Sequence, residues 1–313
     1  MNNKTHLSIV IPVYNGEKTI GRLVDELIKE LGNYYKLEIV LVNDNSPDNS
    51  EAVCISLFER YKGIVKFYSL SKNVGEHSAV MAGLSKTTGD YVVIMDDDFQ
   101  NPISEVVKLI DKFKDGDYDV VYSYYAEKRH SFFRNLGSKF NDKVANLMLK
   151  KPKDLYLSSF KALNRFMVNE ILRYQGPFPY IDGLILQTTD RIGRVMVEHH
   201  PRLEGRSGYT LKKLVSLWLN MFTSFSILPL RFAVLFGLIL SLVGLFMGVY
   251  IFFEKLSNPK LPIGYASLAV IVSIFAGIQL IMIGMVGEYL GRVFLTLNKK
   301  PQYTIKRSFE SNQ

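Results

Sequence analysis

The sequence predicts an α/β protein with a parallel sheet in its N-terminal part and a membrane-spanning helical hairpin near its C-terminal end. Short apolar runs alternate with segments of helical periodicity through the first third of the chain, which is the pattern of a parallel sheet with crossover helices. The hairpin is predicted from two uncharged stretches, at 232–253 and 262–287. Each is long enough to cross a hydrocarbon core, which needs roughly 20 apolar residues.

The alternating elements can be placed one by one. Apolar runs rich in β-branched residues predict strands at Leu7–Val13, Leu37–Val42, Val65–Leu70, Tyr91–Met95 and Tyr118–Tyr124. Apolar residues at helical spacing predict helices over Ile20–Leu31, Val53–Tyr61 and about Ile103–Phe113. Asp48 and Glu51 have the spacing of a capping box for the second of these helices.

The stretch Gly89–Pro102, GDYVVIMDDDFQNP, carries the strongest functional signal. A predicted buried strand is followed directly by Asp96, Asp97 and Asp98, and Gln100 adds another oxygen donor. Open α/β sheets bind ligands at the carboxyl ends of their strands. A divalent cation would relieve the repulsion between adjacent carboxylates and could also bind a substrate's phosphates. The alternative is an acidic, solvated turn.

A second predicted strand also ends on acid, at Asp44, so a nucleotide could be held between the two strand ends. The alternative for Asp44 is an ordinary turn residue. Asn73 and Gly75 lie in a loop where backbone could approach a phosphate, although a glycine in such a loop is usually just a turn. Nothing around His77 suggests a metal cluster or a base, and we expect this residue to pack or cap.

Composition limits the compartment and the partners. The single cysteine, Cys54, excludes an internal disulfide, as suits a reducing compartment. The net charge of +8 fits a chain held against an anionic leaflet or handling phosphates, and no nucleic-acid motif accompanies it. The apolar run at Leu7–Val13 is short and contains Pro12, so we expect no signal peptide.

Basic residues flank the expected hairpin on both sides, whereas the connection at 254–260 is nearly balanced in charge. They are Lys212, Lys213 and Arg231 before it, and Arg292, Lys299, Lys300, Lys306 and Arg307 after it. By the positive-inside rule, the N-terminal domain and both termini are expected in the cytoplasm, giving a multi-pass inner-membrane protein. The alternative is two buried core helices, which seldom run this long without a polar face.

Several motifs together resemble a known family. With IVIPVYNG, VNDNSPDNS and MDDDFQNP in this order and spacing, the chain resembles a glycosyltransferase of family two, which implies the Rossmann-like A-type fold. NVGEHSAVMAGL, HHPRLEGRSGYTLKKL, TSFSILPLR and GIQLIMIGMVGEYLGRVF resemble its polyprenyl-phosphate branch, which includes bactoprenol glucosyltransferases and formamido-arabinose transferases. The resemblance covers about the whole chain.

The resemblance implies roles for matching residues. The implied nucleotide contacts are Pro12, Tyr14, Asp44, Asn73, Asp96 and Asp97, with the first three at the uridine end. The implied ligands of Mg²⁺ or Mn²⁺ are Asp98, Gln100 and Asp96, and the implied catalytic residues are Asp96, Asp98 and Ser159.

Two positions depart from the family pattern. Asn43 stands where the family has the first acid of a paired-acid motif, which leaves Asp44 alone. Ser159, in SSFKAL, stands where the glucosyltransferases carry the acid of GDFRLM. A sugar hydroxyl acceptor would need a base. A lipid phosphate, whose second pKa is about 6, is already largely an anion near neutral pH.

The acceptor site is expected to be basic and near the membrane. Arginine binds phosphate bidentately, and the candidate phosphate contacts are Arg134, Ser138, Arg202, Arg206 and Ser207. Amphipathic stretches at about 130–150 and at 211–230 have the pattern of helices lying in the headgroup plane. The alternative for each is a core-facing helix with a solvated back.

We therefore expect a cytosolic nucleotide-sugar domain at 1–210, an interfacial helix at 211–230, the hairpin at 231–290 and a basic cytoplasmic tail at 291–313. The expected activity is inverting transfer of one sugar from a nucleotide diphosphate, UDP above all, to polyprenyl phosphate. It would serve O-antigen, lipid A or wall-polymer modification in a homo-oligomer that binds no nucleic acid.

Three alternatives remain open. A processive polysaccharide synthase usually carries QxxRW, but the only tryptophan is Trp218, and two spans are too few for a conducting channel. A DxDxT phosphatase would have threonine in place of Gln100. The third alternative is a non-catalytic membrane scaffold that keeps the nucleotide fold.

Overall fold

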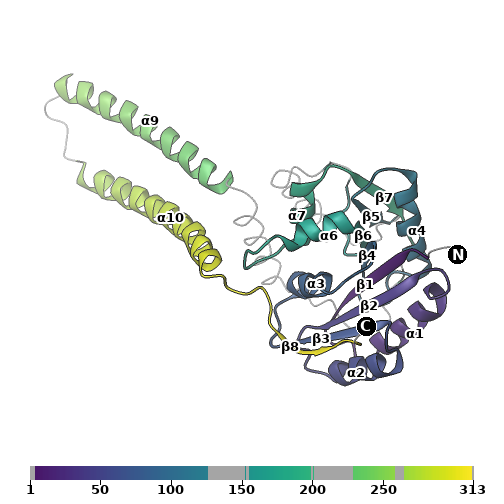
Figure 1. The fold of residues 1–313 in the computed structure, drawn as a ribbon. Coiled ribbons are helices and arrows are strands. Elements are labelled where there is room, and N and C mark those ends of the chain that lie inside the picture. Colours follow the sequence, from purple (N-terminus) through teal and green to yellow (C-terminus); the bar gives the residue numbers. More distant parts are fainter. Residues whose placement is uncertain are drawn as a thin grey trace. The chain divides into compact units, whose positions relative to one another are not determined.

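The computed structural model describes residues 4–125, 152, 155–198, 200, 228–257 and 264–311. The chain forms two compact units, Met1–Thr210 with Lys299–Gln313, and Leu211–Asn298. The first unit is an α/β domain built on one sheet, and the second contains two long apolar helices (Figure 1). The predicted fold class is thus confirmed.

The sheet of the described chain has eight strands in the order β7-β5-β6-β4-β1-β2-β3-β8. Five strands were predicted, and their bounds are β1 His6–Val13, β2 Lys36–Asn43, β3 Val65–Leu70, β4 Tyr91–Ile94 and β5 Val120–Tyr124. Three were not predicted, namely β6 Lys161–Asn164, β7 Ile192–Met196 and β8 Ile305–Phe309. Strands β4, β1, β2 and β3 run parallel, whereas β6 and β8 are antiparallel to their neighbours.

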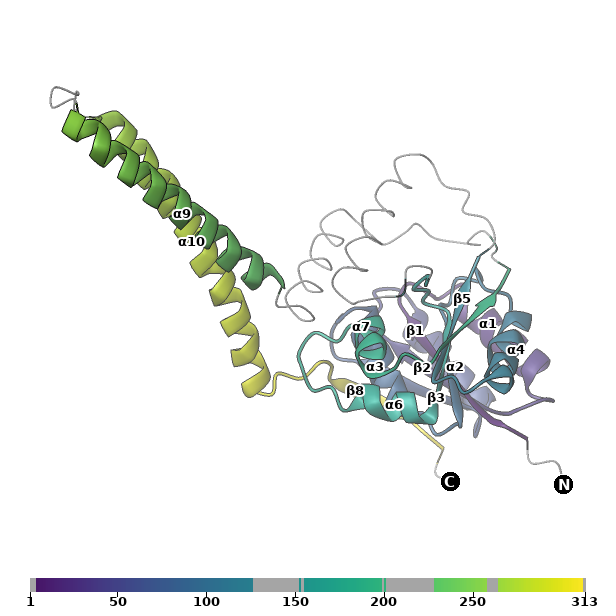
Figure 2. The same cartoon turned by 90° about the horizontal axis from the view of Figure 1, so that it is seen from above.

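Helices cover both faces of the sheet (Figure 2). Their bounds are α1 Ile20–Leu31, α2 Ser50–Arg60, α3 Glu76–Leu84, α4 Ser104–Lys112, α6 Arg165–Leu172 and α7 Ile181–Thr188, with a 3-10 turn, η1, at Phe113–Asp115. Alternate residues of a strand point to opposite faces, so Ile9 and Ile11 join the core under α1 while Val10 faces α3. A Cβ on Gly83 of α3 would lie only 2.4 Å from Val10 Cγ1. Glycine therefore allows α3 to approach β1 closely.

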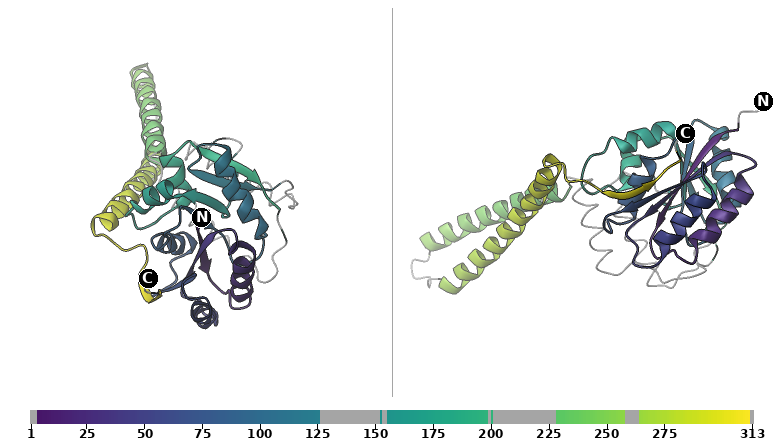
Figure 3. Two further views of the ribbon diagram at one scale, coloured as in Figure 1. Left: turned by 45° about the vertical axis from the view of Figure 1, so that its right-hand side comes forward. Right: turned by 60° about the horizontal axis from the view of Figure 1, so that its bottom comes forward.

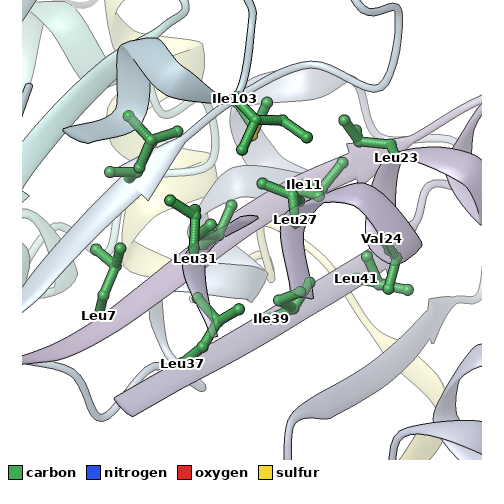
Figure 4. Packing of buried hydrophobic residues seen from close by; sticks show 14 of the residues in the cluster. Leu7, Ile11, Leu23, Val24, Leu27, Leu31, Leu37, Ile39, Leu41 and Ile103 are labelled. Atoms are coloured by element: carbon green, nitrogen blue, oxygen red, sulfur yellow. The ribbon is translucent and has the colours of Figure 1, made fainter. Parts of the chain in front are cut away.

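The main core lies between the sheet and helix α1. Leu23, Leu27 and Leu31 recur at helical spacing and point from α1 onto the strands (Figure 4). Each is at most 1% exposed, and burying a leucine side chain stabilises the fold by about 1.5–3 kcal/mol. This packing fixes where the carboxyl ends of the central strands lie.

The expected capping box at the start of α2 is wrong. The helix begins at Ser50 after Asn49, which makes no side-chain capping bond. Instead, the Ser50 N–H donates to Asp48 Oδ1 at 3.2 Å, and Arg307 pairs with Glu51 at 3.0 Å. Glu51 is therefore used to hold the C-terminal segment.

That segment, β8, adds to the free edge of β3 (Figure 3). Phe309 faces Phe67 across the pair, with ring centroids 5.6 Å apart, and Phe58 of α2 lies 5.8 Å from the same ring. Residues that precede and follow the two apolar helices therefore belong to one sheet.

The second unit contains helices α9 Leu228–Ser257 and α10 Tyr265–Leu297. Leu230–Glu254 and Ile274–Leu297 are long and apolar enough to cross a membrane, and the described chain buries neither. Phe246, for example, is 71% exposed. This exposure argues against two buried core helices. Helix α10 continues ten residues beyond the expected end at 287, with Arg292 bonded to Glu288 at 2.9 Å.

Candidate active site

The candidate site lies where β1, β2 and β4 end. These strands are neighbours and parallel, so the loops that follow them meet at one edge of the sheet. Each loop contains a non-glycine residue with a positive φ, namely Asn15 at 57°, Asn45 at 51° and Phe99 at 58°. This conformation is costly for a bulky side chain such as phenylalanine, and such strain is concentrated at functional sites.

Asp44 organises the loop after β3. Its Oδ1 accepts a 2.7 Å bond from the Val74 N–H, and its Oδ2 accepts a 2.9 Å bond from the Gly75 N–H. Asn73 Nδ2 donates to the Asp44 carbonyl at 3.3 Å. Burial raises the pKa of the Asp44 carboxyl, and the two N–H bonds offset part of that rise. The structure thus brings Asp44 and Asn73 together.

The hydrogen bonds of Asn43 account for an amide where the family pattern has an acid. It is fully buried, and its Nδ2 donates to Ser69 Oγ at 3.3 Å while its Oδ1 accepts the Ser46 N–H at 3.1 Å. A carboxylate could not donate the first of these bonds. The amide therefore joins β2 to β3 and holds the loop that carries Asp44.

Asp96 and Ser159 are also brought together. Ser159 Oγ donates to Asp96 Oδ2 at 2.8 Å. The serine in place of the family's acid therefore holds one aspartate of the acidic tip, Asp96–Asp98. Asp97 packs against the loop after β1, since a Cβ on Gly16 would lie only 2.0 Å from Asp97 Oδ2. Glycine at position 16 therefore leaves room for this carboxylate.

Asp98 is 7% exposed, and its Oδ1 accepts the Gln100 N–H at 3.1 Å. In the described chain, no three Asp, Glu, His or Cys side chains form a metal-binding cluster. Mg²⁺ is typically held by one or two protein carboxylates together with substrate phosphates. The oxygen donors of Asp96, Asp98 and Gln100 are of the type that Mg²⁺ or Mn²⁺ prefers.

Pro12 and Tyr14 lie at the end of β1. Pro12 is opposite Val42 in the parallel pair, and Tyr14 is 48% exposed. His77, in the first turn of α3, packs edge-on against the Tyr180 ring with centroids 5.0 Å apart. Burial lowers the pKa of His77. Packing, as expected, accounts for this histidine.

Sequence reasoning missed several residues around the tip. Tyr125 OH donates to Asn101 Oδ1 at 3.0 Å, and the His200 N–H donates to the Gln100 carbonyl at 2.9 Å. Lys161 and Asp182 form a buried ion pair. The His200 contact is made by backbone, so side-chain chemistry gives no signal for it. The ion pair joins residues 21 positions apart, which spacing alone does not reveal.

The expected acceptor-phosphate residues Arg134, Ser138, Arg202, Arg206 and Ser207 lie outside the described residues. So do the expected interfacial segment at about 130–150 and most of that at 211–230. The His200 contact does place the chain next to Gln100 immediately before residue 201.

Comparison of the sequence with known proteins gives consistent relatives. The chain is 31% identical over 306 residues to undecaprenyl-phosphate 4-deoxy-4-formamido-L-arabinose transferase from Klebsiella pneumoniae (strain 342), covering 96% of this chain and 93% of the relative. The enzyme of the same name from Edwardsiella ictaluri (strain 93-146) is 30% identical over 312 residues, covering 98% and 95%.

Among solved structures, glucosyl-3-phosphoglycerate synthase from Mycobacterium tuberculosis, in complex with uridine diphosphate, aligns with a TM-score of 0.53 at 21% identity, covering 71% of this chain and 79% of that one. Its complex with Mn²⁺ and uridine-diphosphate-glucose also gives 0.53, at 20% identity, covering 70% and 77%. These alignments support the fold alone. Residues 8–172 match the family described as "Glycosyl transferase family 2". The chain therefore belongs to glycosyl transferase family 2.

Proposed function

We propose that the chain is a membrane-bound inverting glycosyltransferase that moves one sugar from a nucleotide diphosphate to polyprenyl phosphate. The family assignment and the relatives' names support this activity. The proposed role of the product is in O-antigen, lipid A or wall-polymer modification.

One observation carries the proposal, the acidic tip after β4 beside the Asp44 loop. A solvated turn would expose its carboxylates, but Asp98 is only 7% exposed, and Asp96 and Asp97 are half-buried. Buried carboxylates are costly unless they are bonded or bind a cation. The tip is therefore suited to bind a divalent cation together with the phosphates of a ligand.

The donor is a nucleoside diphosphate sugar, with UDP as the proposed nucleotide. We assign the nucleotide contacts to Pro12, Tyr14, Asp44, Asn73, Asp96 and Asp97. The exposed ring of Tyr14 offers a stacking surface. The Asp44 loop supplies a wall that its own hydrogen bonds hold in place.

Mg²⁺ or Mn²⁺ would be held by Asp96, Asp98 and Gln100. When bound, the cation would neutralise the negative charge that develops on the departing diphosphate. The solved relative's complexes contain Mn²⁺ with uridine nucleotides, which supports this ligand chemistry.

The acceptor needs no strong base. A lipid phosphate monoester has a second pKa of about 6 and is largely dianionic at neutral pH. Its oxygen attacks the anomeric carbon as the bond to the diphosphate breaks on the opposite side, which inverts that centre. Ser159 holds Asp96 during this step, and Asp96 and Asp98 are the proposed catalytic carboxylates of the tip.

The acceptor phosphate is assigned to Arg134, Ser138, Arg202, Arg206 and Ser207. Arginine matches phosphate geometry bidentately. The segments at about 130–150 and 211–230 would lie in the headgroup plane, as amphipathic helices do. The backbone bond from His200 to Gln100 supports this assignment, because Arg202 follows two residues later.

The proposed orientation is cytoplasmic for the α/β domain and both termini. Strand β8 supports a common side for both flanking segments, since residues on either side of α9 and α10 share one sheet. Two crossings satisfy this requirement. The cytoplasmic side is proposed from the basic residues that flank the two apolar helices. The enzyme would work as a homo-oligomer in the inner membrane.

The test is release of UDP from UDP-sugars by the purified full-length chain in detergent. We expect release only when Mn²⁺ or Mg²⁺ and polyprenyl phosphate are both present. Polyprenol, which lacks the phosphate, is the matched control and should give none. Turnover that persists in excess chelator, or with polyprenol, would contradict the proposal.

The scaffold alternative is tested in the same assay by Asp98→Ala. We expect loss of at least about a hundredfold in turnover, the scale for removing one group that stabilises developing charge. Full glycosylation in cells carrying this variant would favour the scaffold.

A further inference from the structure

A buried charged cluster lies next to the acidic tip. Lys161 of β6 donates to Asp182 Oδ1 at the start of α7, and Tyr122 of β5 donates to the same oxygen at 2.7 Å. Lys161, Asp182 and Tyr122 are 3%, 7% and 1% exposed. The Lys161 ammonium also lies 5.0 Å from the centre of the Tyr122 ring.

The strand register places this cluster one row behind the tip. Lys161 is opposite Ile94 of β4 on one side and opposite Tyr122 of β5 on the other. Asp96 follows Ile94 by two residues, just beyond the end of β4, and Ser159 precedes Lys161 by two, just before β6 begins. The bond between Ser159 and Asp96 thus continues the contact between β4 and β6 beyond their last paired residues.

Stability does not explain a buried ion pair at this place. Taking both charges out of water costs several kcal/mol per ion, and apolar residues of similar shape often replace such a pair without loss. What a pair offers over apolar contacts is one preferred geometry, because the ammonium and the carboxylate must meet at hydrogen-bond distance.

A second set of bonds holds the same segment from its other side. Ser123 Oγ lies 2.8 Å from Ser158 Oγ and donates to the Phe160 carbonyl at 2.7 Å. Residues on both sides of Ser159 are therefore attached to β5 through Ser123. The lysine that follows is attached to α7 and, through Asp182, to Tyr122.

We propose that Lys161 and Asp182, with the Tyr122 hydroxyl, are positioning residues that hold Ser159 at the distance from which it orients Asp96. They touch neither substrate nor metal and act through Ser159. This inference rests on the proposed glycosyl transfer, because its effect is on the turnover of that reaction.

The main test compares the double variant Lys161→Met/Asp182→Leu with the wild type in detergent. Removing both charges leaves no ion unpaired, so we expect a melting temperature close to that of the wild type. We expect kcat to fall about tenfold and KM for the nucleotide sugar to stay within about twofold, since a small misplacement of a reacting geometry costs rate. The single variant Lys161→Arg keeps a cation at this position and should retain most of the wild-type kcat.

The matched control is the pair Lys66 and Glu38, 2.7 Å apart, in which Glu38 is buried and Lys66 is partly exposed. Glu38 lies in the first half of β2, away from the strand ends that carry the site. Lys66→Met/Glu38→Leu should change the melting temperature without changing kcat. A milder variant, Tyr122→Phe, removes only the hydroxyl that donates to Asp182. It should lower kcat several-fold at constant KM even if the double variant does not fold.

A double-mutant cycle with Ser159→Ala identifies the route. If the pair acts through Ser159, Lys161→Met/Asp182→Leu should lower kcat by less than about twofold in that background. A full tenfold loss there would overturn the proposal, and so would unchanged kcat in Tyr122→Phe or in the folded double variant. If the wild type itself transfers no sugar to polyprenyl phosphate, the proposed function fails and the inference fails with it.

Discussion

Gly16 shows how one residue without a side chain shapes the acidic tip. The Asp97 carboxylate occupies the space that a Cβ at this position would need, 2.0 Å from Oδ2. Gly16 and Asp97 belong to different motifs and are 81 positions apart in the chain. Their contact joins the loop after β1 to the loop after β4, and both loops carry proposed nucleotide contacts.

Gly16→Ala is expected to displace Asp97 and to weaken UDP binding about tenfold or more, because separations below 3 Å force a shift. Calorimetric titration of UDP with Mn²⁺ measures the effect. Gly21→Ala, in α1, is the control, since its Cβ would lie 3.7 Å from Val53 in ordinary contact. It should raise helix stability slightly and leave UDP binding unchanged. Wild-type affinity in Gly16→Ala would contradict the proposed site.

Ionised Glu38 contributes to the stability of the fold, and this contribution is lost in acid. Burial raises the pKa of its carboxyl, but bonds from Lys66, Ser8 and Thr88 outweigh burial and leave the pKa lower than its ordinary 4.5. A carboxyl with a lowered folded-state pKa stabilises the fold above the unfolded pKa, and that contribution is lost as pH falls towards the folded pKa.

We therefore expect the melting temperature to fall as pH drops below about 4.5, through protonation of Glu38 among other groups. Glu38→Gln should be less stable than the wild type at neutral pH, and the difference should shrink as pH falls. Thermal unfolding of both proteins across this range is the measurement. A difference that grows in acid would contradict the assignment.

At the scale of elements, strand β8 closes the sheet edge that β3 would otherwise expose. Exposed edges present unpaired backbone groups and favour aggregation. The Ser71 N–H also donates to the Thr304 carbonyl at 2.9 Å. The segment that follows α10 therefore contacts the start of the loop after β3. This is the loop whose backbone Asp44 holds.

Phe309→Ala is expected to destabilise the α/β domain by about 2–3 kcal/mol, somewhat below the range for a fully buried phenylalanine because Phe309 is half-buried. Arg307→Ala is the matched control on the same strand. It removes only an exposed ion pair with Glu51 and should cost less than about 1 kcal/mol. Denaturant unfolding of both variants measures the difference, and equal costs would show that the ring contributes no more than the exposed ion pair.

The sequence predicted the elements whose signal is local. The five parallel-sheet strands and helices α1, α2 and α4 follow from hydrophobic periodicity, and the acidic tip follows from its position after a strand. Strands β6, β7 and β8 were not predicted, and β6 and β8 show a physical reason. β6 contains Lys161, and a lysine in a sequence usually indicates an exposed position, although this one is buried. The sequence of β8, IKRSF, has the composition of a basic tail, and only its pairing with β3 shows that it is a strand.

The same limit applies to the site. Asp96, Asp44 and Asn73 could be selected from residue type and strand position. The bond from Ser159 to Asp96 spans 63 residues, and the bond from Tyr122 to Asp182 spans 60. Such contacts depend on which strands are neighbours, which no local pattern encodes. Tertiary structure was needed to show that Ser159 replaces an acid with a hydrogen-bond donor.

At the scale of the whole molecule, two crossings of the membrane are expected between the segments that share the sheet. Cys54 makes this simple to test, because it is fully buried and burial strongly raises the pKa of its thiol. The wild type should therefore not react with a membrane-impermeant maleimide. Glu254→Cys and Asn298→Cys place one accessible thiol near the far end of α9 and one just after α10.

We expect these two thiols to be labelled from opposite sides in vesicles of known orientation. Asn298→Cys should react from the side that carries the α/β domain, located by protease accessibility. Labelling of both thiols from one side would contradict two crossings. Reaction of the wild type would instead show that Cys54 is accessible and would invalidate the background.

The position of β8 after both apolar helices also has a consequence for synthesis. Seven of the sheet's eight described strands leave the ribosome before the first apolar helix does, yet the β3 edge stays open until the residues after α10 are made. The α/β domain can therefore finish folding only after both apolar helices have been translated. A chain that stalls or misorients during insertion would keep an open edge, which distinguishes it from a correctly inserted enzyme and exposes it to proteolysis.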